Sequence, residues 1–216
     1  MVWVKICGMT NLEDAQAAVD AGADALGFVF AVSPRHVAPA VAREITRALP
    51  DGIEKVGVFV NESAVRIREV AEEAGLTGVQ LHGDEILDVA AKLAAEPGSP
   101  GKLRVIPVYP IRHLLKEDVL VNFWTDRVLF DTAVEGKQGG TGQTWDWKLG
   151  KAAIELLQGH VRVIVAGGLT PVNVADAVRT LHPWGVDVSS GVEREPGKKD
   201  HEKVRAFVKA AKGADL

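Results

Sequence analysis

Short apolar runs and segments of helical periodicity alternate along almost the whole chain. The apolar runs are rich in β-branched residues and have the length of strands. After each of them, apolar residues recur every three or four positions, which is typical of a helix with one buried face, and this pattern is weakest at residues 111–117. The predicted strands cover residues 2–7, 25–30, 55–60, 78–81, 103–108, 127–130, 161–165 and 185–188.

Capping signals predict where several of the helices begin and end. Thr10 and Glu13 have the spacing of a capping box, with Thr10 as the N-cap. Thr170 followed by Pro171 predicts a second helix start, because proline fits the first helical position. Further N-caps are expected at Asp84 and Asp200, and helix ends at Gly22 and Gly75.

The alternation gives eight β/α units of about 27 residues each, near the lower size limit of a (β/α)8 barrel. Alternating strands and helices favour a parallel sheet, so a doubly wound open sheet is the alternative. Against it, no G-x-G-x-x-G motif follows the first strand. Two small domains would fit into 216 residues, but we predict one TIM-barrel domain over residues 1–216.

Composition narrows the classes of function. Hydrophobic residues make up 47% of the chain and the net charge is −4, which argues against general nucleic-acid binding. No apolar run approaches a membrane span, and the N-terminus lacks the apolar core of a signal peptide. Cys7 is the single cysteine and the six histidines are scattered. We therefore expect a cytoplasmic protein that has a reduced thiol and contacts neither membrane nor nucleic acid.

Two glycine-containing turns follow the last two predicted strands. The first contains Gly167 and Gly168, and the second contains Ser190 and Gly191 after Ser189. In a (β/α)8 barrel the seventh and eighth loops often hold a phosphate through backbone N–H groups. The sequence therefore predicts a phosphorylated small molecule as the substrate.

Reactive side chains gather where the predicted strands end, and these ends share one rim in a barrel. Each of them also has a plain structural explanation, such as a core cysteine, a turn-capping aspartate, a solvated arginine or a flexible glycine linker. Their placement on one rim favours a joint role. The candidates are Cys7, Arg35, Gln80, His82, Asp131, Asp187 and the loop containing Gly140, Thr141 and Gly142.

Cys7 and Asp131 form a plausible acid–base pair. They end the first and sixth strands, so their side chains are expected to face each other across a small substrate. A thiolate can accept a proton from carbon, and a carboxylic acid can protonate a leaving oxygen. We expect the pKa of Cys7 to be lowered from roughly 8.5 by Lys5 or the substrate, and that of Asp131 to be raised from roughly 3.9 by burial and Asp187.

The chain resembles the phosphoribosylanthranilate isomerases of tryptophan biosynthesis. The resemblance covers residues 5–193 in order, and the matching segments are Lys5–Thr10, Gly27–Phe30, Ser33–Arg35, Val60–Asn61, Val79–Gly83, Phe130–Asp131, Gly139–Gly142, Ala166–Leu169 and Asp187–Glu193. Two departures are mild: Ala31-Val32 stands before Ser33, and Trp145 stands where phenylalanine is commoner.

The resemblance implies an Amadori rearrangement of N-(5-phosphoribosyl)anthranilate to 1-(2-carboxyphenylamino)-1-deoxyribulose 5-phosphate. It implies that Asp131 is the general acid, that Cys7 takes the proton from C2 of the sugar, and that no metal or organic cofactor takes part. Arg35 would bind the anthranilate carboxylate. Gln80, His82, Gly140, Thr141 and Asp187 would contact the substrate, and Gly142, Gly167, Gly168, Ser189, Ser190 and Gly191 the phosphate.

Other classes stay open at this point. A pentose-phosphate epimerase would need metal-binding histidines and acids at several strand ends, where only His82 stands. An indole-glycerol-phosphate synthase would need lysine and glutamate there, which Lys5 alone does not supply. A non-catalytic phosphate-binding barrel would not need Cys7 and Asp131. The oligomeric state is left as monomer or homodimer.

Overall fold

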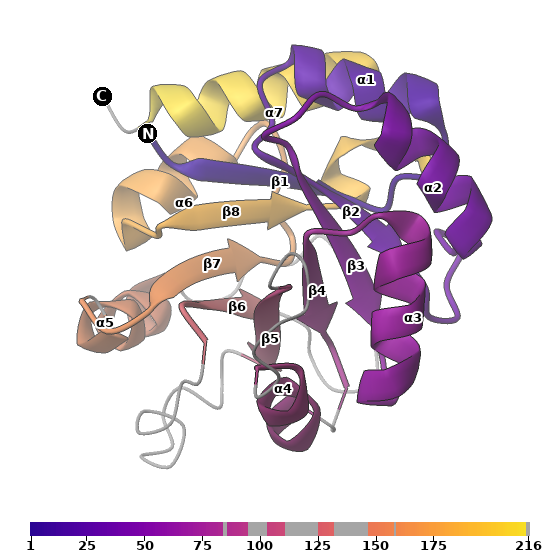
Figure 1. Cartoon of the computed structure of the whole chain (residues 1–216). Helices are drawn as coiled ribbons and strands as arrows, with labels where there is room; N and C mark the ends of the chain where they lie inside the picture. Colours follow the sequence, from indigo (N-terminus) through magenta and orange to yellow (C-terminus); the bar gives the residue numbers. More distant parts are fainter. Residues whose placement is uncertain (84–85, 95–102, 111–124, 132–146, 158, 215–216) are drawn as a thin grey trace.

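Parallel strands from all eight β/α units close into one barrel, which confirms the predicted (β/α)8 architecture (Figure 1). The computed structural model describes residues 1–83, 86–94, 103–110, 125–131, 147–157 and 159–214. Each strand pairs with the next, and β1 pairs with β8 to complete the ring. The strands are β1 (Trp3–Cys7), β2 (Ala25–Val29), β3 (Glu54–Phe59), β4 (Gly78–Leu81), β5 (Arg104–Pro110), β6 (Arg127–Asp131), β7 (Arg162–Ala166) and β8 (Gly185–Val188).

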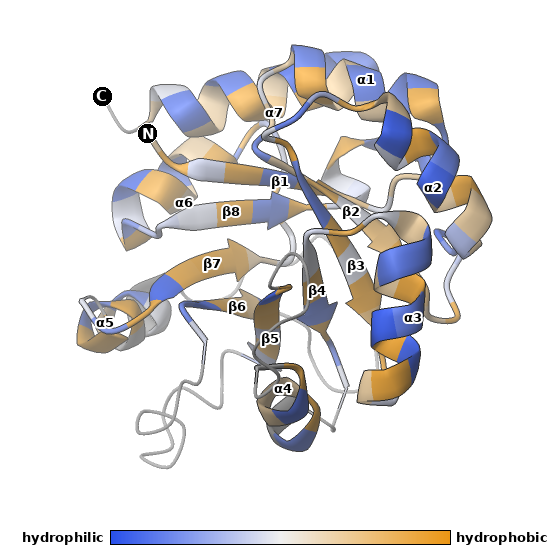
Figure 2. Cartoon of the chain, viewed as in Figure 1, coloured by the Kyte–Doolittle hydropathy of each residue, from blue (hydrophilic) through white to orange (hydrophobic). Residues whose placement is uncertain are grey.

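The described helices lie on the outside of the barrel, and hydrophobic and hydrophilic residues alternate along them (Figure 2). The helix expected at residues 111–117, the cap at Asp84, and Trp145 lie outside the described residues. The described α-helices are α1 (Leu12–Asp20), α2 (Pro39–Ala48), α3 (Ala64–Ala74), α4 (Ile86–Ala94), α5 (Trp147–Leu157), α6 (Val174–Leu181) and α7 (His201–Gly213).

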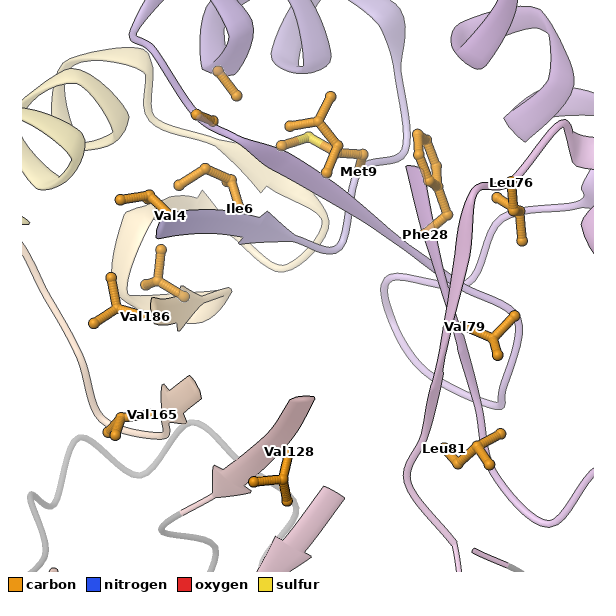
Figure 3. Close-up of a cluster of buried hydrophobic side chains, with 14 of the residues drawn as sticks. Val4, Ile6, Met9, Phe28, Leu76, Val79, Leu81, Val128, Val165 and Val186 are labelled. Carbon is orange, nitrogen blue, oxygen red and sulfur yellow. The ribbon is translucent and has the colours of Figure 1, made fainter. Parts of the chain in front are cut away.

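The barrel has two apolar layers because successive strand residues point to opposite faces. Outward-facing residues such as Val4, Val79 and Val186 pack under the helices (Figure 3). Inward-facing residues form a separate interior cluster, which includes Trp3 and Ile164. Alternation along β1 also puts Lys5 and Cys7 on the inward side with Trp3, so the sequence of one strand sends a cation and a thiol into the barrel.

The N-terminal ends of the strands are closed by an aromatic and ionic cluster. Trp3 stacks on Trp184 with 5.2 Å between ring centroids, and the Arg127 guanidinium lies 4.6 Å from the Trp184 ring. Arg127 also donates to Glu54 at 2.7 Å. This end has the packing expected of a stability face, which leaves the opposite rim for chemistry.

Helix α1 begins one residue later than predicted. Its N-cap is Asn11, whose side-chain oxygen accepts from the backbone N–H of Asp14 at 2.8 Å, so the prediction of Thr10 was wrong. The Thr10 hydroxyl instead donates to the carbonyl of Gly197. A tertiary bond therefore uses the side chain that the local pattern assigned to the cap.

Helix α6 also begins later than the Thr170-Pro171 signal predicted. Thr170 to Asn173 form a turn, and the first helical residue is Val174. Asn173 stabilises that turn by accepting from the N–H of Thr170 at 2.7 Å and donating to the carbonyl of Gly168 at 3.0 Å. The cap predicted at Asp200 is confirmed, since its carboxylate accepts from two backbone N–H groups of α7.

A short antiparallel hairpin, which the sequence pattern did not predict, lies between β8 and α7. A 3₁₀ turn (Ser190–Val192) leads into β9 (Glu193–Glu195), which pairs with β10 (Lys198–Lys199). Gly197 joins the two strands at a φ of 81°, which favours glycine. We call residues 193–199 the β9–β10 hairpin. In the part of the chain that the structure describes, no helix is long and apolar enough to span a membrane.

Candidate active site

The carboxyl ends of the strands hold the candidate residues that the structure describes. Cys7 is the last residue of β1 and Asp131 the last residue of β6, three strand positions apart around the ring. Gln80 lies in β4 and Asp187 in β8. Because all eight strands are parallel, their carboxyl ends meet at one end of the barrel, and these residues lie there.

Lys5 is the centre of a buried polar cluster inside that end. Its ammonium donates to the Gln80 side-chain oxygen at 2.8 Å and to the Asp187 carboxylate at 3.0 Å, and its side chain is fully buried. Burial alone would lower the pKa of Lys5, yet Asp187 and Cys7 raise it overall. Lys5 therefore stays charged beside the thiol. Gln80 and Asp187 accept hydrogen bonds from its ammonium and hold it there.

The Cys7 thiol lies in a gap that a glycine leaves open. A Cβ on Gly27 would stand 2.6 Å from the sulfur and 3.1 Å from the Lys5 Cε, so no larger residue fits there. Burial raises the pKa of Cys7, and the charge of Lys5 offsets this only in part. Lys5 lowers the pKa of Cys7 as expected, but desolvation of the thiolate outweighs that attraction, so the expected net lowering was wrong for the free chain.

Asp131 lies at the mouth of the barrel with His82 beside it. The His82 Nε2 atom is 3.8 Å from a carboxylate oxygen of Asp131, and the Asp131 side chain is 15% exposed. His82 follows β4 directly and is more exposed. Asp187, which we expected to act on Asp131, is bonded to Lys5 instead.

Arg35 reaches the same rim from the loop after β2. Its side chain lies over Gly8, where a Cβ would stand 2.7 Å from the Arg35 Cδ. The guanidinium makes two hydrogen bonds to Glu193, from Nε at 2.8 Å and from Nη2 at 2.7 Å. Its charge is close enough to act on the Cys7 thiol. A cation of fixed geometry therefore lies beside the predicted base.

The two glycine turns after β7 and β8 pack directly against each other. Gly167 and Gly168 adopt φ values of 86° and 64°, in the region that glycine favours. A Cβ on Gly191 would stand 1.9 Å from the carbonyl oxygen of Leu169, so the backbones of the two turns touch. Ser189 places a buried hydroxyl in the second turn, and this hydroxyl has no hydrogen-bond partner among the residues that the structure describes. This backbone arrangement can present N–H groups to one anion.

Gly140, Thr141 and Gly142 lie outside the described residues, and their predicted roles stay predictions. Within the described ranges, no group of three or more histidine, cysteine, aspartate or glutamate side chains has the arrangement of a metal site.

Sequence reasoning did not select Glu193 and Lys199 as site residues. The Lys199 ammonium is fully buried and bonds the Glu193 carboxylate at 2.9 Å. Glu193 ends the motif after β8, and its approach to Arg35 is a contact 158 residues apart in sequence. No local pattern signals that pairing. Glu195 and Lys198 flank Pro196-Gly197, and this turn-forming sequence is the local signal that could have indicated a hairpin.

The location of these groups defines the class of protein. Enzymes with a (β/α)8 barrel place their reactive side chains at the carboxyl ends of the strands, and a phosphate often lies at the last two loops. This chain has a thiol, a carboxyl group and paired glycine turns in those positions. A family model described as N-(5'phosphoribosyl)anthranilate (PRA) isomerase matches residues 4–210, and the chain belongs to this family.

Relatives match over the full length of the chain. The N-(5'-phosphoribosyl)anthranilate isomerase of Trichlorobacter lovleyi is 44% identical over 215 residues, covering 99% of this chain and 100% of the relative. The protein of that name from Thermotoga neapolitana is 45% identical over 216 residues, with 99% and 100% covered. The resemblance drawn from the sequence motifs is therefore confirmed, and the chain is an isomerase.

Solved structures give the same result. The phosphoribosyl anthranilate isomerase of Thermotoga maritima superposes with a TM-score of 0.87 at 41% identity, covering 99% of this chain and 100% of that one. A structure of such an isomerase in complex with reduced 1-(o-carboxyphenylamino)-1-deoxyribulose 5-phosphate has a TM-score of 0.83 at 40% identity and the same coverage. The fold and its family therefore agree.

Proposed function

We propose that this chain catalyses the Amadori rearrangement of N-(5-phosphoribosyl)anthranilate to 1-(2-carboxyphenylamino)-1-deoxyribulose 5-phosphate, a step of tryptophan biosynthesis. Family membership supports the reaction. One observation carries the assignment of residues: Cys7 and Asp131 end β1 and β6 at the same rim. An aldose-to-ketose isomerisation needs a base for a carbon-bound proton and an acid for an oxygen, and these two groups supply both.

In the first step, Asp131 is the general acid. Its carboxyl proton goes to the furanose ring oxygen as the C1–O bond breaks. The ring opens, and the anilino nitrogen lone pair forms a C=N bond, which gives a protonated Schiff base. Asp131 lies at the mouth of the barrel next to His82, and this position gives its carboxyl group access to a bound sugar.

In the second step, Cys7 is the base that removes the proton from C2. The electrons of the C2–H bond form a C1=C2 double bond, and the iminium nitrogen becomes neutral. The resulting enolamine tautomerises to the ketone. Because the substrate's iminium accepts the electrons, the reaction needs no metal or organic cofactor.

The charge of the intermediate explains how a buried thiol can act as a base. Burial raises the pKa of Cys7 in the free chain. The iminium brings a positive charge next to the sulfur, and Lys5 already supplies a second positive charge from the interior of the barrel. Two cations in a desolvated site favour the thiolate, because Coulomb energies grow as the local dielectric constant falls.

The remaining rim residues would hold the two ends of the substrate. We assign the anthranilate carboxylate to Arg35, whose planar guanidinium suits a carboxylate. The backbone of Gly167, Gly168, Ser190 and Gly191 is assigned to the phosphate, with Ser189 beside it. The contact of these two turns supports that assignment. Gln80, His82 and Asp187 stay proposed substrate contacts.

We also propose that the protein works in the cytoplasm, where the Cys7 thiol stays reduced. Among the solved relatives, the Thermotoga maritima protein is described as a dimeric isomerase from which monomers were generated. For this chain, a monomer and a homodimer are both compatible with a site whose described residues come from one barrel.

The experiment that tests the function follows the fluorescence of N-(5-phosphoribosyl)anthranilate as purified chain is added in the presence of a metal chelator. We expect the signal to be lost with turnover, and the ketose product to be identified by mass and NMR. Unchanged substrate would contradict the proposal. Activity that requires an added metal would contradict its cofactor-free mechanism.

A further inference from the structure

The guanidinium of Arg35 pairs with the carboxylate of Glu193, which is almost completely buried. Glu193 takes both hydrogen bonds of the guanidinium edge formed by Nε and Nη2, at 2.8 and 2.7 Å. The Glu193 side chain is only 5% exposed, whereas that of Arg35 is 19% exposed. The carboxylate therefore faces the protein, and the arginine faces the mouth of the barrel.

The acceptors of Glu193 are occupied from inside the protein. Its Oε1 atom accepts from Lys199 Nζ at 2.9 Å and from the N–H of Gly197 at 3.3 Å, in addition to Arg35. Burial alone would raise the pKa of Glu193, but Arg35 and Lys199 lower it overall, so the carboxylate is charged. A charged carboxylate fully engaged by protein donors is suited to hold a neighbour rather than to bind a ligand.

The β9–β10 hairpin that carries Glu193 and Lys199 is fastened to the barrel. The N–H of Lys199 donates to the buried Asp14 carboxylate of α1 at 2.9 Å. The Thr10 hydroxyl donates to the Gly197 carbonyl, and Lys199 Nζ also reaches the Ser189 carbonyl at 3.3 Å. These bonds fix the hairpin to the segment that follows Cys7, so the position of Glu193 is set relative to the predicted base.

Within the described part of the chain, the guanidinium of Arg35 is bonded by Glu193 along one edge, which leaves its other edge to a ligand. Arginine has five N–H groups, and the pair with Glu193 uses one on Nε and one on Nη2. The Nη1 hydrogens and the second Nη2 hydrogen remain, on a side chain held over Gly8. A carboxylate can receive two parallel hydrogen bonds from this edge.

We propose that Glu193 and Lys199 are positioning residues that hold Arg35 in the orientation needed for the aromatic carboxylate of the substrate, and so determine specificity for a carboxylated ring. The proposal rests on the proposed function, since it needs anthranilate as the ring. Preorganising a flexible side chain removes an ordering cost that binding would otherwise include. The benefit is expected only for ligands that carry the carboxylate.

The test measures binding of two ligands by calorimetry: reduced 1-(o-carboxyphenylamino)-1-deoxyribulose 5-phosphate and its phenylamino analogue without the carboxyl group. We expect Glu193→Gln to weaken the first about tenfold or more and the second less than twofold. Lys199→Met should give a smaller loss with the same selectivity. In turnover assays, KM should rise more than kcat falls. The double variant Arg35→Ala/Glu193→Gln should bind no worse than Arg35→Ala.

Glu195→Gln is the matched control, because Glu195 lies in the same hairpin and pairs with Lys198 at the surface. It should leave both affinities unchanged. Equal weakening of both ligands by Glu193→Gln, or of neither, would overturn the positioning role. Failure of the wild-type chain to bind the carboxylated ligand or turn over its substrate would instead contradict the proposed function, so the two failures are distinguishable.

Discussion

At the scale of single residues, the Cys7 thiol lies among charges that nearly cancel. Three cations act on it, and two carboxylates pair with those cations, so one positive charge is left over while the thiol is neutral. The groups are Lys5, Arg35 and Lys199 with Asp187 and Glu193. Ionisation of Cys7 would balance the set. Burial opposes that ionisation in the free chain, so in the proposed mechanism the thiol becomes a base when the substrate brings its own positive charge.

Replacing Lys5 by methionine tests this electrostatic balance. In the proposed mechanism the active form of Cys7 is the thiolate, so we expect kcat/KM to rise with pH through the pKa of Cys7 in the free enzyme. Loss of the Lys5 charge raises that pKa, and the unpaired Asp187 acts in the same direction. We therefore expect the acidic limb of the pH profile to move upward by about one pH unit or more.

The matched change is Lys92→Met, since Lys92 pairs with Asp88 on the surface of α4. It should leave the profile where it is. The charges of Arg35 and Lys199 remain in the Lys5→Met variant, so part of the activity should return at high pH. A profile that does not move would mean that Lys5 has no effect on Cys7.

The positions of Cys7 and Asp131 at the rim were predictable from the sequence, whereas the residues that hold Arg35 were not. Cys7 and Asp131 each follow a short apolar run, and strand ends share a rim in this fold. Glu193 and Lys199 act through contacts to residues far away in the sequence, which no local pattern encodes. The raised pKa of Cys7 was also missed, because burial is a property of the folded chain.

At the scale of elements, the turns after β7 and β8 act as one unit. Gly191 lies against the Leu169 carbonyl so closely that a methyl group at that position would stand 1.9 Å from the oxygen. Asn173 braces the first turn through Thr170 and Gly168. The spacing of the two turns thus depends on a glycine in one and an asparagine near the other.

Substituting Gly191 by alanine should separate these turns. We expect the KM for the phosphorylated substrate to rise at least about tenfold, because the backbone N–H groups no longer converge on one phosphate. Inhibition by inorganic phosphate should weaken in parallel. Gly213→Ala is the control, since a Cβ there meets nothing within 4 Å. An unchanged KM would show that the contact does not set the phosphate site.

The order of the eight barrel strands was predictable from the sequence, but the β9–β10 hairpin and several helix boundaries were not. The N-cap of α1 moved from Thr10 to Asn11 because the Thr10 hydroxyl is bonded to the β9–β10 hairpin. The start of α6 moved because Asn173 stabilises a preceding turn. At α1 a contact with a distant segment decided which residue caps the helix, and at α6 a local turn stabilised by Asn173 delayed the helix start.

At the scale of the whole molecule, the barrel depends on inward-facing side chains that touch across the ring. Ile164 is fully buried in the interior cluster, together with Trp3 and Leu129. The architecture was predictable because eight apolar runs alternate with amphipathic segments, and that rhythm is a property of the whole chain.

Ile164→Ala should therefore destabilise the entire barrel. Removing a buried isoleucine side chain typically costs about 2–5 kcal/mol of unfolding free energy. Denaturant melts followed by tryptophan fluorescence and by far-UV circular dichroism should both shift to lower midpoints. Val172→Ala should change the unfolding free energy by no more than about 0.5 kcal/mol, because Val172 is 89% exposed. Equal effects of the two substitutions would contradict a single interior core.

Turnover of N-(5-phosphoribosyl)anthranilate by the Cys7→Ser and Asp131→Asn variants tests the acid–base pair most directly. Each substitution removes one proton-transfer group at the rim and keeps the shape of the side chain. We expect kcat to fall at least about a hundredfold in each variant, with the far-UV circular dichroism spectrum unchanged. Full turnover by either folded variant would contradict the roles assigned to Cys7 and Asp131.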